Sequence, residues 1–493
     1  MQESAGEIDK NPARCYNEPG NGPAFRIPRA GREVFMFPNQ DMFPYSYIGK
    51  EHFPGTCFPY VVYSVGETRG PAPCALAVVQ DGRNDELVSA LEKLHGEGRA
   101  PACLVIGIHS GWSTLPDGEY WLARQEEYDA FDPGYGDFLI DEFIPRVISE
   151  GGYVVSDDPD MHLIAGGSSG GTCAFAAAWF RPDCFRRLYL SSPSFLSMEK
   201  GDEAISLIRK NETRPFRVAM EYSESEPIAY FGDLRQADVC AEKAFEFAGY
   251  DFISRYCPGE DHCSRFHNTE TLYEILGWLW NDYEKPLAAP RNQPRLDDIV
   301  LPGEGWTPCD KMPEQAPEEG EHGSYGVRDG RVTFFPKDGG AVFAEGDYYD
   351  LREVALSANK RFIYAADAAR GCLRKYVIGP DGVPGTMSRH GMFHIKPDFV
   401  RPGAYSICVD DVNRVFAATE LGIQCVVFNG LIEAVLDPPV YGAYAEKIAF
   451  GGEGFGYLYA QLPDRRVFRR KMKHAGRASV TNLPEDYMKQ FVY

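Results

Sequence analysis

Two adjacent serines, Ser168 and Ser169, are the residues of this chain best placed for covalent chemistry. They lie in the stretch GGSSGG (166–171), between an apolar run and an alanine-rich, helix-like run. A serine hydroxyl becomes a nucleophile when a base removes its proton. A tight strand-to-helix turn with small residues two positions before and after the serine presents it for that purpose. The spacing suits both serines, so the residues alone leave the choice open, and a glycine-rich loop without chemistry is the alternative.

Candidates for the acid and the base follow the serines along the chain. The order serine, acid, histidine is the one found in the type of α/β fold that carries such a turn. The run AMEYSESEP ends a predicted strand and offers Glu224 and Glu226, and CPGEDH ends another and offers His262. Carboxyl ends of parallel strands meet at one edge of a sheet, so we expect these groups to gather there. His267 is a competing base and Asp233 a competing acid.

The transition state of such a reaction also needs N–H donors for the developing negative oxygen. In this type of fold one donor comes from the loop after an early strand. The run VVQDGRN (78–84) occupies that place. Gly82 permits close backbone approach, so the amide of Arg83, or that of Gly82, is the predicted donor.

The elements that must position these groups alternate between strands and helices from about residue 46 to residue 285. This rhythm predicts an α/β class with a doubly wound, mostly parallel sheet. The predicted strands are 58–65, 74–82, 101–111, 161–167, 186–194, 214–223 and 251–262, and the predicted helices are 86–98, 137–150, 234–250 and 270–283.

The pattern changes after residue 285. Residues 286–298 are rich in proline and polar residues and are predicted to be a linker. From residue 299 to residue 493, short strand-like runs are separated by Gly, Asp and Asn turns. Such runs are typical of antiparallel propeller blades, and the length suffices for roughly four blades. Residues 1–45 are interpreted as an N-terminal extension.

Composition limits the partners. The 493-residue chain has a formal net charge of -22, and a surface this acidic repels phosphate backbones, so nucleic acid is not an expected partner and neither is an anionic membrane. No apolar run reaches the 18 residues of a membrane span. The N-terminal sequence does not have the pattern of a signal peptide.

The cysteines favour reduced thiols in a reducing, cytoplasmic compartment; the alternative is a periplasmic or secreted location after removal of a signal peptide. Thirteen are scattered along the chain, with no CxxC pair and no zinc-type spacing. No metal site is therefore expected. Four of the cysteines lie in apolar or helical settings and are interpreted as small core residues: Cys173, Cys184, Cys240 and Cys257.

The stretch IAGGSSGG, followed by an aromatic, alanine-rich helix and RPDCF, resembles the family of enterochelin esterases, feruloyl esterases and esterase D. FPGTCFPYVVYSV, VVQDG, EEYDAF and FAGYDF…GEDH…LGWLW resemble further pieces of it. The resemblance covers roughly residues 50–285 and implies an α/β-hydrolase fold without a cofactor. It selects Ser168 as the nucleophile and the amide of Ser169 as an oxyanion donor. It matches the acid to Glu226, where the family has Asp, and this departure keeps Glu224 as an alternative.

The C-terminal part resembles the gluconolactonase and regucalcin propeller family. LREVALSANKRFIYAADAARGCLRKYVIGPDG, VFAATELGIQCVVFNG and KIAFGGEGFGYLY carry the resemblance. Its metal-binding positions match His322 and Tyr405 here, and a tyrosine is a poor ligand for a hard cation. We therefore expect neither lactonase activity nor a calcium-type site. The expected roles of this part are stabilising the protein, making an oligomer contact, or shaping the substrate cleft.

Together these features predict a serine carboxylic-ester hydrolase that acts through an acyl-enzyme. Aromatic residues around the expected cleft are interpreted mainly as packing, although as a lining they would suit an aromatic acyl group or a sugar ring: Trp112, Tyr120, Trp121, Tyr128, Tyr135 and Tyr230. A feruloyl or acetyl ester of a carbohydrate is the leading substrate. The alternatives are a siderophore or other small-molecule ester, acyl transfer to a sugar, and a catalytically silent carbohydrate-binding protein. A homo-oligomer is compatible with the sequence.

Overall fold

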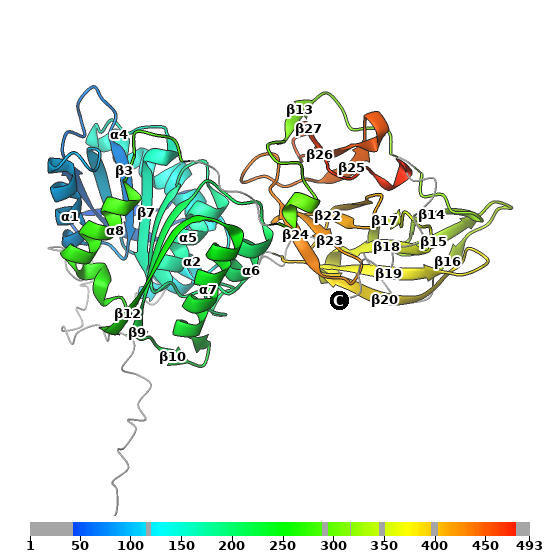
Figure 1. The fold of residues 1–493 in the computed structure, drawn as a ribbon, viewed down its shortest axis with the longest axis horizontal. Helices are drawn as coiled ribbons and strands as arrows, with labels where there is room; N and C mark the ends of the chain where they lie inside the picture. Colours follow the sequence, from blue (N-terminus) through cyan, green and yellow to red (C-terminus); the bar gives the residue numbers. More distant parts are fainter. Residues whose placement is uncertain are drawn as a thin grey trace, which may run out of the picture.

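A computed structural model describes residues 43–114, 120–287, 294–315, 317–344, 351–395 and 403–479. It shows an α/β part built on one large sheet, and a second part built from small antiparallel sheets (Figure 1). The predicted N-terminal extension lies outside the described residues up to residue 42. The predicted limits of the two parts, 46–285 and 299–493, stay predictions.

The large sheet has ten strands in the order β12-β9-β8-β7-β3-β4-β2-β5-β6, with β1 paired to β2. Strands β12 to β4 along this path are parallel, whereas β1, β2, β5 and β6 pair antiparallel. The sheet is thus mixed, with a parallel centre of apolar strands buried on both faces. The bounds are β1 Tyr45–Ile48, β2 Cys57–Val65, β3 Ala75–Gln80, β4 Cys103–Ile108, β5 Trp112–Thr114, β6 Tyr120–Leu122, β7 His162–Gly167, β8 Arg187–Ser191, β9 Arg217–Ser225 and β12 Asp251–Asp261.

Helices cover both faces of this sheet, which makes it doubly wound. One apolar core contains the buried sides of α1 and α8, and a second contains those of α5, α6 and α7. The bounds are α1 Asp85–Gly96, α2 Arg124–Tyr128, α3 Gly134–Asp137, α4 Ile144–Gly151, α5 Ser169–Phe180, α6 Glu203–Lys210, α7 Leu234–Ala248 and α8 Thr269–Leu279. The small hairpin β10 Ile228–Ala229 and β11 Gly232–Asp233 lies between β9 and α7.

The helix predicted over 137–150 is longer and less regular than expected. Helices α3 and α4 are joined without a break by a π-helical segment, η2 Phe138–Phe143. Pro145 stands in the first turn of α4 and has no N–H to continue an α-helical hydrogen-bond ladder from the preceding turn. The wider π-helical segment therefore comes directly before α4, in whose first turn Pro145 has no N–H to donate to a backbone carbonyl.

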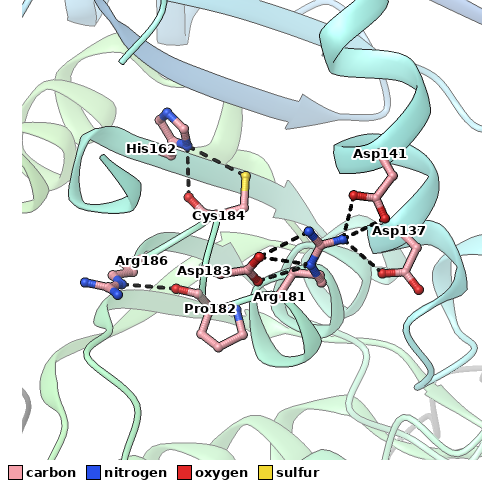
Figure 2. A network of polar contacts seen from close by, with 8 residues as sticks. All are labelled: Asp137, Asp141, His162, Arg181, Pro182, Asp183, Cys184 and Arg186. Atoms are coloured by element: carbon pink, nitrogen blue, oxygen red, sulfur yellow. Dashed lines mark hydrogen bonds and ion pairs between the residues drawn. The ribbon is translucent and has the colours of Figure 1, made fainter. Parts of the chain in front are cut away.

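The C-terminal end of α5 is anchored by Arg181 (Figure 2). Its guanidinium donates to Asp137 at 3.2 Å, to Asp141 at 2.9 Å and to Asp183 at 3.1 Å. The loop after α5 is also tied to the start of β7, because His162 Nδ1 lies 2.9 Å from the carbonyl oxygen of Cys184. These contacts hold the helix against its neighbours at the end opposite Ser168.

The second part has a propeller-like arrangement of four small sheets in the described chain. Strand β13 pairs with β27 from the other end of this part, so that early and late segments share one sheet. The bounds are β13 Thr307–Cys309, β14 Gly323–Arg328, β15 Arg331–Pro336, β16 Val342–Phe343, β17 Leu351–Leu356, β18 Phe362–Asp367, β19 Cys372–Ile378, β20 Pro384–Met392, β21 Ser406–Val409, β22 Val415–Thr419, β23 Gly422–Val426, β24 Ile432–Leu436, β25 Lys447–Gly451, β26 Tyr457–Gln461 and β27 Val467–Lys471.

The end of the predicted linker packs against this second part. Residues 288–293 lie outside the described chain, but η5 Leu296–Asp298 forms a short turn of 3₁₀ helix. Leu296 and the following Ile299 and Val300 are buried in a core shared with β22 to β26. An apolar residue inside an otherwise polar segment thus anchors it.

All twelve cysteines in the described residues are free thiols. Cys173 and Cys257 are buried as expected, and Cys184 is partly buried. The interpretation of Cys240 as a core residue is wrong: it is exposed on α7, because the apolar side of that helix is formed by Ala237, Ala241 and Ala244 instead. Among the described helices, none combines the length and the apolar character needed to cross a membrane.

Candidate functional site

Ser168 occupies a strained turn between β7 and α5. Its backbone has φ 56° and ψ −128°, which is costly for a residue with a side chain. A Cβ on Gly166 would lie 2.1 Å from the carbonyl oxygen of Gly170, so only glycine allows the strand and the helix to approach this closely. Ser169 is the first helical residue and its side chain is buried. Of the two serines, Ser168 therefore stands at the bend.

His262 and Glu226 form a hydrogen-bonded pair at the same edge of the sheet. His262 Nδ1 lies 2.5 Å from Glu226 Oε2. The other oxygen, Oε1, accepts from Ser192 Oγ at 2.6 Å and from the amide of Ser223 at 2.7 Å. Burial alone would raise the pKa of Glu226, but the hydrogen bonds from His262, Ser192 and Ser223 outweigh it and hold this pKa below its ordinary value. Glu226 is thus an ionised, oriented carboxylate at neutral pH.

The competing residues have other contacts. Glu224 is exposed and its Oε2 accepts from the amide of Gly259 at 2.8 Å. Asp233 caps α7 by accepting from the amide of Gln236 at 3.1 Å. His267 is exposed in the turn η4 Ser264–His267 and packs edge-on against Phe266. Within the described chain, Glu226 is the one of the three acids that hydrogen-bonds to His262.

The structure places His262 beside the serine turn without a hydrogen bond between His262 and Ser168. Ser168 Oγ instead lies 3.2 Å from Ser194 Oγ. His262 Nε2 lies 3.6 Å from Cys263 Sγ, and that sulfur is 3.1 Å from where a Cβ on Gly167 would stand. The imidazole and the turn are therefore neighbours. Serine and histidine hydrogen bonds at such sites are often completed only when substrate is bound.

The start of α5 and the turn after β3 lie close together beside Ser168. The first N–H groups of α5, including that of Ser169, have no acceptor within the helix. The turn after β3 abuts this helix start, since a Cβ on Gly170 would lie 2.8 Å from Asp81 Oδ2. Gly82 has φ 91°, a conformation that suits glycine. The side chain of Arg83 pairs with Asp85 on the surface, so only its amide is available to the site.

Sequence reasoning missed Ser192 and Ser194. They follow β8, whose parallel partner is β7, and so lie at the strand end next to Ser168. Ser192 has φ 45°, and the amide of Ser194 donates to the carbonyl oxygen of Ser168 at 3.1 Å. The signal available was the polar run SSPS directly after an apolar strand.

The aromatic residues divide into two groups. Tyr128 and Tyr135 are buried packing residues, as expected. Trp121 and Tyr230 are exposed, at 52% and 96%. Trp112 is partly buried, and the side chain of Tyr120 lies outside what the structure describes.

The positions matched to metal ligands have other surroundings. Tyr405 donates to Glu420 Oε1 at 2.9 Å and stacks on Tyr444. His322 lies beside Gly382: a Cβ added to Gly382 would lie 2.7 Å from the Cβ of His322. In the residues that the structure covers, no three His, Cys, Asp or Glu side chains form a group able to hold a metal ion.

No family model matches this chain, and no curated protein matches it. Among solved structures, an enterochelin esterase from Shigella flexneri is similar, with 17% identity, coverage of 47% of this chain and 57% of that chain, and a TM-score of 0.35. A ferulic acid esterase is similar at 16% identity, with coverage of 48% and 95% and a TM-score of 0.35. A putative gluconolactonase is similar at 17% identity, with coverage of 30% and 47% and a TM-score of 0.25. The matched region thus spans little more than half of the enterochelin esterase.

Proposed function

We propose that this protein is a serine carboxylic-ester hydrolase. The observation that carries the proposal is the 2.5 Å contact between His262 and Glu226 beside the strained turn of Ser168. A histidine oriented by a buried carboxylate next to a partly buried, strained serine is an arrangement that activates a hydroxyl nucleophile. Glu226 holds the imidazole with its Nδ1 protonated and stabilises the imidazolium that forms.

The reaction begins when Ser168 turns from Ser194 toward His262. His262 Nε2 accepts the hydroxyl proton as Ser168 Oγ bonds to the ester carbonyl carbon. The amides of Ser169 and Arg83 donate to the resulting oxyanion. The imidazolium then returns its proton to the departing alcohol, which leaves an acyl-enzyme. Water, deprotonated by the same imidazole, hydrolyses this ester and restores Ser168.

Ser194 defines the resting state of the nucleophile. Its hydroxyl is buried and lies within hydrogen-bond distance of Ser168 Oγ. Ser168 therefore has a partner when no substrate is present. The cost of breaking this contact is that of one neutral hydrogen bond, on the order of 1 kcal/mol.

A feruloyl or acetyl ester of a carbohydrate is the substrate that we propose. The support is an exposed aromatic side chain near the acid in the sequence: Tyr230 stands in the turn between β10 and β11, four positions after Glu226. This turn is held near the loop that follows β8 and carries Ser194. Ser197 Oγ donates to the carbonyl oxygen of Phe231, and a Cβ on Gly232 would touch Leu196. A flat aromatic face at the rim suits a phenolic acyl group or a sugar ring.

Hydrolysis of p-nitrophenyl acetate by the wild type, Ser168→Ala and Ser169→Ala tests the reaction. We expect Ser168→Ala to lose activity by at least a thousandfold and Ser169→Ala to retain most of it. A fluorophosphonate label should be found on Ser168 by mass spectrometry. Equal, negligible rates for the wild type and Ser168→Ala, with no labelling, would favour a silent carbohydrate-binding protein.

A panel of esters then tests the substrate class. Feruloyl and acetyl esters of arabinose and xylose are compared with a siderophore triester, each with and without an added sugar acceptor. Faster turnover of the sugar esters supports the proposed substrate. Faster turnover of the siderophore overturns it, and product growth that depends on the acceptor would indicate acyl transfer.

A further inference from the structure

A cavity of about 260 Å³ lies between the α/β part and the second part. Its walls come from the end of α5, from Arg214 before β9, and from the loops after β22 and β24. The volume is near the lower limit of ligand pockets, roughly 300 Å³, and so suits a single ring. No residue of the proposed catalytic machinery lines it.

The cavity is remote from Ser168. Trp179 and Phe180 line it and are the last two residues of α5, whereas Ser168 immediately precedes the first. A helical rise of 1.5 Å per residue puts about 16 Å between Ser168 and Trp179 along the axis. A molecule in this cavity would therefore be out of reach of the nucleophile.

One residue of the wall is a buried charge, Arg214. Arg214 is only 5% exposed and packs over the Trp179 ring at 3.7 Å from the ring centroid. Its Nη2 donates to Asp437 Oδ1 at 2.9 Å, but its Nε and Nη1 find no acceptor in the described residues. Buried N–H groups without acceptors are costly. Both of these nitrogens have almost no accessible surface, so the rest of the side chain is what lines the cavity.

The other residues that line the cavity supply a negatively charged group and flat aromatic side chains. Glu420, which accepts from Tyr405 Oη, contributes a carboxylate, and Tyr441 and Tyr444 contribute aromatic side chains. Asp437 lies just behind the cavity and also accepts from Tyr441 Oη at 3.2 Å. The acidic groups around Arg214 oppose a net negative ligand, whereas a hydroxyl group can both donate to a carboxylate and accept from a guanidinium.

We infer that this cavity is a binding site for one neutral sugar ring. The apolar C–H face of the sugar packs on the side chains of Tyr441 and Tyr444, and its hydroxyl groups meet Arg214 and Glu420. The site is separate from the ester-hydrolysing site and does not depend on the reactivity of Ser168. It would hold a carbohydrate near the enzyme while another part of the same material reaches the serine.

Calorimetric titration with the methyl glycosides of xylose, arabinose and galactose tests the inference, with methyl glucuronide and benzoate as charged probes. We expect at least one neutral glycoside to bind with a Kd in the millimolar range or below. Protein first labelled at Ser168 with a fluorophosphonate should bind it equally well. That arm separates failure of the sugar site from failure of the proposed hydrolase.

Ala443→Phe is the decisive variant because it replaces a small, uncharged lining residue with a large one and so fills the cavity without removing a charge. We expect it to weaken binding at least tenfold while the circular dichroism spectrum and thermal midpoint stay unchanged. Ala341→Phe, at an exposed position, is the matched control and should bind as the wild type does. Binding by no neutral glycoside, binding of benzoate or the glucuronide alone, or wild-type binding by Ala443→Phe would each overturn the inference.

Discussion

Buried carboxylates in this protein differ in charge because their hydrogen-bond partners differ. Glu226 accepts from three donors, and its pKa is lowered despite burial. Among the described residues, Glu127 accepts only from the amide of Gly111, and burial raises its pKa to about 7. Burial also raises the pKa of Asp129, next to Ser169, to about 6. Hydrogen-bond donors around a carboxylate can thus offset the effect of burial and keep the acid ionised beside a histidine.

Replacing Glu226 by Gln should lower kcat for p-nitrophenyl acetate by roughly 10²- to 10⁴-fold. Gln keeps the size of the side chain but can no longer stabilise the imidazolium of His262. Glu224→Gln is the matched control, since Glu224 bonds only to the exposed amide of Gly259, and it should keep wild-type kcat. Wild-type activity in Glu226→Gln together with a loss in Glu224→Gln would reverse the assignment of the acid.

Glu127→Gln should change how stability depends on pH. The folded pKa of Glu127, about 7, lies above its ordinary value of 4.5, so the folded state holds a proton that the unfolded state releases. The contribution of Glu127 to stability therefore falls as pH rises from about 4.5 to 7, by on the order of 3 kcal/mol. Urea unfolding at several pH values should show that the Gln variant lacks this loss. Parallel pH curves for the two proteins would contradict the raised pKa.

At the level of secondary structure, the close approach of β7 and α5 determines where Ser168 stands. The helix is buried over almost its whole length, and Arg181 fixes its far end to Asp137 and Asp141 (Figure 2). Because α5 is packed along its length and held at its far end, we expect a change in the spacing between β7 and α5 to be absorbed at the turn that holds Ser168. The reactive geometry is thus a property of two packed elements.

Gly166→Ala should separate β7 from α5 and misplace Ser168. Its Cβ would meet the backbone oxygen of Gly170 at 2.1 Å, and backbone can yield only by moving the strand or the helix. We expect a loss of about 1 to 3 kcal/mol in unfolding free energy and a fall in kcat of at least tenfold. Gly96→Ala, at the end of α1 with nothing within 4 Å of the added atom, is the control. Equal activity of the two variants would show that the contact yields without cost.

Across the entire chain, the two parts are joined by apolar packing and by buried ion pairs. One continuous core includes residues of α5 and α6 together with residues of β17, β18, β22 and β24. Arg214 pairs with Asp437, and Glu212 pairs with Arg470 at 2.7 Å, each across the junction. A junction of this kind favours one cooperative unit over two loosely linked ones.

Asp437→Ala should destabilise the protein by about 3 to 5 kcal/mol. The substitution leaves the guanidinium of Arg214 buried without its carboxylate partner, and an uncompensated buried charge is costly. Asp464→Ala removes a partner of Arg466 from an exposed pair and should cost less than about 1 kcal/mol. Urea unfolding followed by tryptophan fluorescence measures both. Similar losses in the two variants would show that Arg214 reaches water when Asp437 is absent.

Much of the fold follows from local patterns along the chain. The parallel strands are continuous apolar runs bounded by turn residues, and glycines on both sides of Ser168 predict its bend, so these features can be read without three-dimensional information. The same holds for the change to short strands after residue 298. The antiparallel edge of the large sheet and the π turn before Pro145 are less visible, because they depend on neighbours that are distant in the sequence.

Contacts between segments that are distant in the sequence could be identified only in the tertiary structure. Glu224 and Glu226 are two positions apart and chemically equivalent in the sequence, and only the approach of Ser192 and His262 distinguishes them. The approach of Ser194 to Ser168 and the pairing of Arg214 with Asp437, which is 223 positions away, leave no mark on local composition. Hydrophobic periodicity reports which side of an element is buried, but not which side chain of another element it meets. The identity of the acid and the cavity between the two parts are therefore properties of packing.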